Sequence, residues 1–239
     1  WVSYIQMVIL AGGKSVEVPT TMAQNFKVTP EQLDAAITPK TKLVILCSPS
    51  NPTGSVYSEA ELRALAAVLG KHPQVMVLAD EIYEHINYIG GNFSIARCEE
   101  LKDRVCIING VSKAYAMTGW RIGFVAAPLW LAKAITKLQG QYTSGASSIA
   151  QKAAEAAYTG SQQGVEDMRV AFQRRRDLIV SRLREIPGLD VNEPDGAFYV
   201  FPGVTSFFGK KCGDVVINDA NDLAMYLLNE AHVATVSGD

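Results

Sequence analysis

Short apolar runs alternate with longer segments of helical periodicity through the first half of the chain. Residues 6–11, 42–47, 74–79, 104–108 and 122–127 are rich in valine, isoleucine, leucine or alanine and end at polar or turn residues. Such runs are typical of strands covered on both faces. Strands that alternate with helices predict parallel βαβ units. We therefore expect an α/β fold with a mostly parallel, doubly wound sheet.

Helix boundaries are marked by capping residues. Thr29 followed by Pro30 predicts a helix that starts at the proline and runs to Ala36. Ser58 and Glu61 form a capping box that starts a helix ending near residue 70. Periodicity predicts four further helices over 128–139, 147–158, 163–185 and 219–231.

The remaining apolar stretches are short and predict strands over 16–18, 189–191, 197–201 and 233–236. The period changes after Pro187 and Gly188, which indicates the start of a smaller α+β domain. We expect a large domain over 1–160 that is incomplete at its N-terminus. A long connecting helix over 161–187 and part of a small C-terminal domain over 188–239 should follow.

Composition excludes several classes of function. The 239 residues are 48% hydrophobic with a formal net charge of −2 and no basic run, so nothing indicates a nucleic-acid partner. No apolar run approaches the ~20 residues that span a bilayer, so we expect no membrane association. The four cysteines show no paired spacing, and reduced thiols in a cytoplasmic protein are the simpler interpretation.

Polar side chains of unusual variety follow successive predicted strands. Asn51 follows the strand over 42–47, Asp80 and Tyr83 follow the next, and Lys113 follows the strand over 104–108. Ligands of open α/β sheets bind beyond the carboxyl ends of the strands, where a lysine can act as a nucleophile. Each residue also has an ordinary interpretation: a turn asparagine, an aspartate helix cap, a packed tyrosine and a solvated lysine.

Two more residues extend this set. Ser112 precedes the lysine, and Arg121 stands at the start of the apolar run 122–127, where its guanidinium could hold a phosphate. The ordinary interpretations are less convincing for the whole set, because the residues follow adjacent strand ends.

These residues resemble the class I pyridoxal-phosphate (PLP) aminotransferases of the aspartate aminotransferase fold, fold type I. The lysine segment fits the family signature through Gly110, Ser112, Lys113, Gly119, Arg121 and Gly123. The segments 50–54 and 80–83 fit two further blocks in the expected order, and 196–199 looks like a small-domain strand of the family. The resemblance covers essentially the whole chain.

The resemblance implies a role for each residue. Lys113 would form the Schiff base with PLP and then move a proton, while Asp80 would pair with the pyridine nitrogen. Tyr83 and Asn51 would hydrogen-bond the ring's 3-oxygen. The remaining cofactor-binding residues would be Arg121 and Ser112 at the phosphate and Trp1 stacked on the ring.

Two positions depart from the family pattern. Some members carry a phosphate-binding serine three residues before the lysine, where this chain has Gly110. Some members have a histidine that supports the aspartate three residues after the stacking tryptophan, where this chain has Tyr4. We hypothesise that the Tyr4 hydroxyl takes over that supporting role.

The chain starts at Trp1 and ends before the substrate-binding arginine that the family carries near its C-terminus. We therefore expect an internal portion of a longer polypeptide, whose 239 residues alone would not transaminate efficiently. The resemblance also implies a homodimer with shared active sites.

The function that follows from the resemblance is ping-pong transamination between amino-acid and 2-oxo-acid substrates, with aspartate and 2-oxoglutarate as the expected pair. The residues of the signature are most similar to those of the bacterial aspartate aminotransferases. Alternatives are an aminotransferase for aromatic amino acids or alanine, and a PLP-binding regulatory module that senses an amino acid. A degenerate scaffold without cofactor is disfavoured by Lys113, Asp80 and Arg121.

Overall fold

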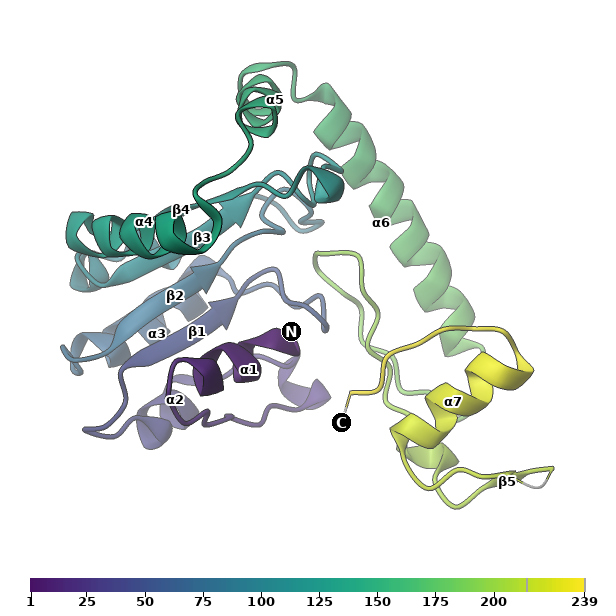
Figure 1. Cartoon of the computed structure of the whole chain (residues 1–239). Coiled ribbons are helices and arrows are strands. Elements are labelled where there is room, and N and C mark those ends of the chain that lie inside the picture. Colours follow the sequence, from purple (N-terminus) through teal and green to yellow (C-terminus); the bar gives the residue numbers. More distant parts are fainter. Residues whose placement is uncertain (214, 239) are drawn as a thin grey trace. The chain divides into compact units, whose positions relative to one another are not determined.

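The computed structural model describes residues 1–213 and 215–238. Its helices are α1 (Ser3–Leu10), α2 (Pro30–Ala36), α3 (Glu59–Gly70), α4 (Leu129–Thr143), α5 (Ser148–Thr159), α6 (Gln163–Arg184) and α7 (Ala220–Glu230). Its strands are β1 (Leu43–Cys47), β2 (Met76–Asp80), β3 (Val105–Gly110), β4 (Gly123–Ala126), β5 (Lys211–Cys212) and β6 (Val215–Val216). Figure 1 labels most of these elements along the ribbon.

The central sheet has the order β1-β2-β3-β4, with the first three strands parallel and β4 antiparallel to β3. Its register pairs Cys47 with Asp80 and Asp80 with Ile108. The carboxyl ends of the three parallel strands therefore lie at the same edge of the sheet (Figure 1). This edge carries the loops in which the sequence placed its candidate site residues.

The main core lies between the sheet and α3. Leu65, Leu69, Val75, Val77 and Leu101 are each at most 1% exposed and belong to one cluster of packed apolar side chains. Burying a side chain of this size stabilises the fold by roughly 1.5–3 kcal/mol. The threonine cap predicted before α2 and the capping box predicted at the start of α3 are both present, and Thr29 with Gln32 also forms a capping box, so each of these helices begins where the sequence indicates.

The segment over residues 6–11 is not the strand that its composition predicts, because residues 6–10 belong to α1 and Ala11 follows the helix as its C-cap. A short apolar run does not by itself distinguish a strand from a helix. In α1 the backbone bonds are satisfied locally, whereas a strand needs a neighbour in register. The expected strand over 16–18 is likewise absent, and those residues lie outside any helix or strand.

The short strands predicted in the second half of the chain are also wrong. Residues 189–191 contribute only an isolated antiparallel bridge between Asp190 and Gly203, and residues 197–201 form no strand, although the preceding Gly196 bridges to Asn87. Residues 233–236 form no strand. The hairpin of β5 and β6 was not predicted, since its strands have two residues each and carry no readable periodicity.

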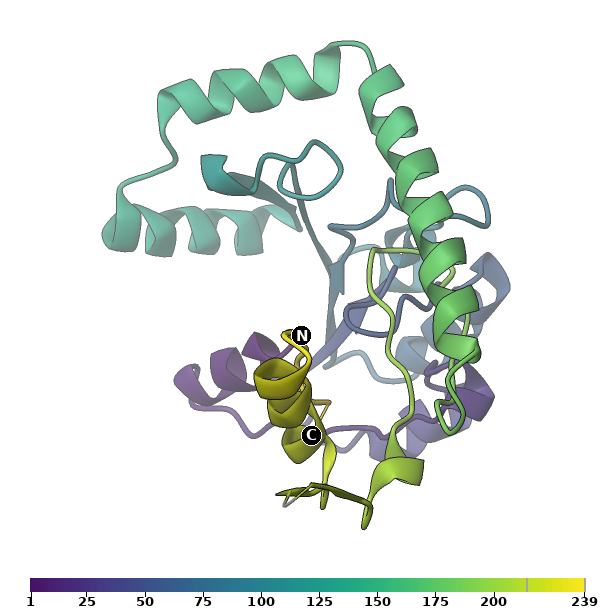
Figure 2. The ribbon, with the colours of Figure 1, turned by 90° about the vertical axis from the view of Figure 1, so that its right-hand side faces the viewer.

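The chain divides into two compact units. The first comprises Trp1–Arg176 with Pro194–Tyr199, and the second comprises Asp177–Glu193 with Val200–Asp239. Helix α6, which Figure 2 shows as one continuous helix, contributes to both units. All seven candidate site residues belong to the first unit. The domain boundaries expected at 160 and 187 stay a prediction.

No helix in the described part of the chain is both long enough and apolar enough to cross a membrane.

Candidate functional site

Asp80 ends β2 and is 8% exposed. Its Oδ2 accepts a hydrogen bond of 2.5 Å from the Tyr4 hydroxyl, and its Oδ1 accepts one of 3.2 Å from the Ile82 backbone N–H. The hydrogen bond that the Tyr4 hypothesis requires is therefore present. Burial, followed by the nearby Cys47 and Asp80, raises the pKa of Tyr4 far above its ordinary value, so Tyr4 stays a donor.

Tyr83 and Asn51 meet at a third residue, Tyr199. The hydroxyl oxygens of Tyr83 and Tyr199 lie 2.5 Å apart, and the Asn51 amide donates to the Tyr199 oxygen at 3.2 Å. Burial, and then the hydrogen bond with Tyr199, raises the pKa of Tyr83. Burial also raises the pKa of Tyr199. These two phenols therefore remain protonated near neutral pH.

Lys113 lies beside Tyr83. Its Nζ is 5.6 Å from the ring centroid of Tyr83 and 5.6 Å from that of Phe198. An ammonium at this distance is attracted by the aromatic faces. The strand-to-loop turn that precedes Lys113 thus places its amine within the group that contains Tyr83 and Tyr199.

Gly110 has a structural reason to be a glycine. A Cβ at this position would lie 2.8 Å from the Cα of Gly123 on the paired strand and 3.0 Å from the Ile122 carbonyl oxygen. A serine would require the β3–β4 pair to separate. The close packing of β3 against β4 therefore accounts for the glycine at position 110, where some family members have serine.

Arg121 and Ser112 lie on one loop, and both are hydrogen-bonded to Thr118 within it. The Arg121 guanidinium donates to the Thr118 carbonyl at 2.9 Å, and the Thr118 hydroxyl donates to the Ser112 carbonyl at 3.0 Å. Arg121 is exposed and adopts the left-handed backbone conformation, with φ of 53°. Its fork of N–H groups is accessible to an anionic ligand.

Trp1 lies next to the Asp80 and Asn51 groups. Its ring makes an edge contact with Tyr4 at 5.4 Å between centroids, and its backbone nitrogen donates to the Asn51 carbonyl at 3.1 Å. The indole is accessible, since the residue is 50% exposed.

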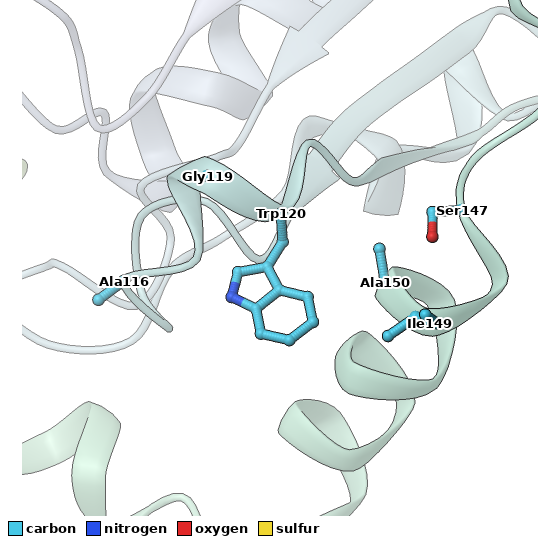
Figure 3. A pocket seen from close by; sticks show the side chains of 6 residues that line it. All are labelled: Ala116, Gly119, Trp120, Ser147, Ile149 and Ala150. Atoms are coloured by element: carbon cyan, nitrogen blue, oxygen red, sulfur yellow. The ribbon is translucent and has the colours of Figure 1, made fainter.

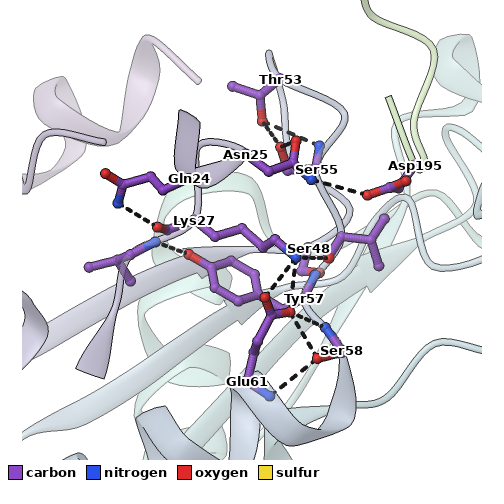
Figure 4. Close-up of polar contacts among 12 residues, drawn as sticks. Gln24, Asn25, Lys27, Ser48, Thr53, Ser55, Tyr57, Ser58, Glu61 and Asp195 are labelled. Atoms are coloured by element: carbon purple, nitrogen blue, oxygen red, sulfur yellow. Dashed lines mark hydrogen bonds and ion pairs between the residues drawn. The ribbon is translucent and has the colours of Figure 1, made fainter. Parts of the chain in front are cut away.

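A polar network outside this cluster holds the loop that carries Asn51 (Figure 4). Lys27 donates to the Val56 carbonyl at 3.2 Å and to Glu61 at 2.9 Å. Burial opposes ionisation of Glu61, but hydrogen bonds from Lys27 and Ser58 hold its pKa below the ordinary value. This ion pair ties the residues after the loop to the start of α3.

A separate hollow lies between the turn after Lys113 and the start of α5 (Figure 3). It is lined by Ala116, Gly119, Trp120, Ser147, Ile149 and Ala150. None of the seven candidate site residues lines it. This hollow is therefore separate from the cluster around Tyr83.

Tyr199 and Cys47 are neighbours of the site that sequence reasoning did not assign to it. The sequence predicts Tyr199 only as part of a small-domain strand. Its place in the segment 196–199, which begins at Gly196 and resembles the family, was the available signal for the site. Cys47 ends β1 as a free thiol, and burial followed by the charge of Asp80 raises its pKa to about 11. The other three cysteines are free as well.

Comparison with known proteins gives one consistent result. The sequence model described as "Aminotransferase class I and II" matches residues 1–239. The "Aspartate/prephenate aminotransferase" of Cereibacter sphaeroides is 51% identical over 241 residues, which cover 100% of this chain and 60% of that protein. The bifunctional aspartate aminotransferase and glutamate/aspartate-prephenate aminotransferase of Petunia hybrida is 45% identical, with 100% of this chain and 51% of that protein covered.

Solved structures agree. The aspartate aminotransferase of Rhizobium meliloti matches with a TM-score of 0.94 and 47% identity, covering 99% of this chain and 60% of that one. The aromatic aminotransferase of Pyrococcus horikoshii matches with a TM-score of 0.92 and 38% identity, covering 100% and 62%. The chain thus spans between half and two thirds of the length of these relatives. The strand order, the lysine loop and these similarities together show that the chain belongs to the class I and II aminotransferase family and has the α/β fold of its members.

Proposed function

We propose that this protein is a PLP-dependent aminotransferase that moves the amino group of aspartate to 2-oxoglutarate by a ping-pong mechanism. The observation that carries the proposal is the placement of Lys113, Tyr83, Asn51 and Asp80. All four lie at or just beyond the carboxyl ends of parallel strands, and Lys113 lies over the ring of Tyr83, which Tyr199 links to Asn51.

The donor set of this edge fits PLP. A buried carboxylate at Asp80 suits a protonated pyridine nitrogen, and the phenol and amide at Tyr83 and Asn51 suit an anionic ring oxygen. Arg121 offers a planar fork to a phosphate. PLP would supply an electrophilic aldehyde and an electron-withdrawing ring.

The chain's own residues have distinct tasks in this proposal. Asp80 would orient the ring by accepting a hydrogen bond from the protonated pyridine nitrogen, while the Tyr4 hydroxyl holds the Asp80 carboxylate in place. Lys113 would supply the amine that condenses with the aldehyde, with loss of water, and would then move the proton at the substrate Cα. Its flexible stem lets one amine serve both tasks.

Three other residues complete the binding of the cofactor. Arg121 binds the phosphate, and the Ser112 hydroxyl assists it because Gly110 has no hydroxyl to contribute. Trp1 stacks on the ring face. These roles rest on the family resemblance together with the accessibility of the Arg121 and Trp1 side chains.

Aspartate is proposed as the amino donor because relatives that are 43–51% identical bear aspartate in their names. Prephenate appears in several of the same names and is a second candidate amino acceptor. Aromatic amino acids are the alternative donors, since an aromatic aminotransferase has the same fold at 38% identity.

The test is an absorption spectrum of the full-length protein with PLP, followed by borohydride reduction and peptide mapping. We expect a visible band that aspartate bleaches and a pyridoxyl group on the peptide that contains Lys113. Lys113→Ala should abolish both, whereas Lys152→Ala on the exposed face of α5 should abolish neither. Absence of the band from the unsubstituted protein would overturn the proposal.

The same experiment separates the alternatives. A band bleached by an aromatic amino acid and not by aspartate would retain the enzyme and change the substrate. A band that persists with every amino acid and 2-oxo acid would favour a PLP-binding regulatory module.

We further propose a homodimer with shared active sites and a cytoplasmic location. The free state of all four cysteines supports a reducing compartment. Immunodetection of the protein in the cytosolic fraction of lysed cells would test the location, and detection in another fraction would contradict it.

A further inference from the structure

The segment Pro194–Tyr199 belongs to the first compact unit although the residues on both sides of it belong to the second. Its backbone is hydrogen-bonded to two loops at the carboxyl edge of the sheet. Gly196 donates to the Gly54 carbonyl at 2.8 Å, and Ala197 donates to the Ile86 carbonyl at 2.7 Å. Tyr88 donates in return to the Asp195 carbonyl at 2.8 Å. The segment is therefore held on both sides.

Close packing adds to this restraint. A Cβ on Gly196 would lie 2.8 Å from the Ile86 carbonyl oxygen and 2.8 Å from the Cβ of Pro49. Ala197 is fully buried with φ of 56°, a conformation that the surrounding contacts impose. Tyr199 follows two residues later, so the position of its hydroxyl is determined by a rigid piece of backbone.

The Tyr199 oxygen can serve two partners at once. It accepts a hydrogen bond from the Asn51 amide at 3.2 Å and lies 2.5 Å from the Tyr83 oxygen, where either hydroxyl can be the donor. A phenol has one proton and two lone pairs. Tyr199 can therefore accept a hydrogen bond from Asn51 and still donate one to Tyr83.

An anionic ligand atom would decide the direction of the bond between the two phenols. An anion is a stronger acceptor than a neutral phenol, so the Tyr83 proton would turn toward it. The lone pair of Tyr83 would then accept the Tyr199 proton. Hydrogen bonds linked in this way polarise one another, and the donation by Tyr83 becomes stronger.

We propose that Tyr199 is a positioning residue that links Tyr83 and Asn51 in one hydrogen-bonded chain and so strengthens their binding of the anionic ring oxygen of the cofactor. This inference rests on the proposed function and deepens it, because it adds a residue that does not itself contact the cofactor.

Several groups face Tyr83 and bear on its protonation. Tyr199 comes from the return segment, Cys47 from the end of β1 and Lys113 from the loop after β3. The Cys47 thiol keeps its proton at neutral pH, since burial followed by the charge of Asp80 raises its pKa to about 11. Phe198 packs against the Tyr83 ring at 5.4 Å and adds no charge.

The measurable consequence is a pH shift. When the ring oxygen receives weaker hydrogen bonds, its negative charge holds the proton on the Lys113 nitrogen more tightly. The pH midpoint of the visible absorption of bound PLP should therefore rise in Tyr199→Phe. Polarisation changes a hydrogen bond by roughly 10–30%, so the expected rise is roughly 0.1–0.7 pH unit. PLP affinity should fall roughly 1.3- to 5-fold for the same reason.

The experiment is a spectroscopic pH titration and a PLP-binding titration of the full-length protein and its variants. Tyr88→Phe is the matched control, because the Tyr88 hydroxyl donates to the Ala197 carbonyl of the same segment. It removes a hydroxyl that holds the segment without removing the link to Tyr83. We expect Tyr88→Phe to lower the thermal unfolding midpoint and to leave the pH midpoint unchanged.

A double variant shows whether Tyr199 acts through Tyr83. On a Tyr83→Phe background, adding Tyr199→Phe should shift the pH midpoint by much less than it does in the unsubstituted protein. A fluorinated tyrosine at position 199, with the fluorine next to the hydroxyl, should lower the midpoint because it is a stronger donor. This variant keeps the side chain's shape and serves if Tyr199→Phe fails to fold.

The outcomes are distinct. A visible band with an unshifted midpoint in Tyr199→Phe would overturn this inference and leave the aminotransferase proposal intact. An equal shift with and without the Tyr83 hydroxyl would also overturn it, since Tyr199 would then act independently of Tyr83. No band in the unsubstituted protein would overturn the proposed function, and the inference would fall with it.

Discussion

The side chain of Asp80 accepts hydrogen bonds from the Tyr4 hydroxyl and from the Ile82 backbone N–H. Asp80 is almost fully buried, so a lost partner is not easily replaced by bulk water. Hydrogen bonds to charged groups stabilise proteins more than neutral ones do. At the scale of single residues, Tyr4 therefore supports Asp80 energetically as well as geometrically.

We expect Tyr4→Phe to lower the free energy of unfolding by about 2 kcal/mol, because an Asp80 oxygen loses its donor. Urea denaturation at neutral pH would measure this, and a titration with PLP should show weaker binding by the same variant. Tyr142→Phe is the matched control, since Tyr142 is 79% exposed on α4 and its loss should have little effect. Unchanged stability and PLP affinity in Tyr4→Phe would contradict the supporting role.

At the scale of elements, two loops cross in close contact at the carboxyl edge of the sheet. Gly54 has φ of +69°, and a Cβ there would lie 2.4 Å from the Pro194 Cβ and 2.9 Å from the Gly196 carbonyl oxygen. Both the backbone conformation and the close approach require glycine. The loop that carries Asn51 and the segment that carries Tyr199 can meet only because this side chain is absent.

We expect Gly54→Ala to lower the free energy of unfolding by about 3 kcal/mol, from backbone strain of roughly 1 kcal/mol and overpacking of 1–3 kcal/mol. Gly12→Ala is the matched control, because Gly12 has φ of +74° with no atom within 4 Å of its added Cβ. It should show the strain alone. Denaturant unfolding of both variants would measure the difference, and equal losses would show that the crossing of the two loops is not close-packed.

At the scale of the whole molecule, much apolar surface is left uncovered. None of the residues of α4 is buried, and its Leu129, Trp130, Leu138 and Tyr142 are 60–79% exposed. Contiguous apolar surface is typical of a face that another polypeptide segment covers. The proposed homodimer offers such a segment.

We expect the full-length protein to sediment as a dimer, with PLP-dependent activity that falls on dilution below the dissociation constant. Analytical ultracentrifugation combined with activity assays over the same concentrations would measure this. A monomer that retains full activity would contradict the shared active sites.

Features of the fold that depend on neighbouring residues were predicted from the sequence, whereas features that depend on distant residues were not. The helix starts at Thr29 and Ser58 were predicted because a threonine cap followed by proline, and a capping box, are each complete within four residues. The segment over 6–11 was predicted wrongly because its apolar residues suit a strand, while the deciding factor, a neighbouring strand in register, is not local. The family resemblance was confirmed, since its signature is contiguous around Lys113.

The sequence by itself determined the lysine loop, the order of strands and helices around it, and the membership of the family, because each is written in local patterns of side chains. Only the tertiary structure decided that Tyr199 joins Tyr83 to Asn51, and only it gave the hydrogen bond from Tyr4 to Asp80 that the family resemblance had suggested. These contacts join residues 76, 116 and 148 positions apart. Contacts at such separations depend on how loops at one edge of the sheet pack together, and no local pattern encodes that packing.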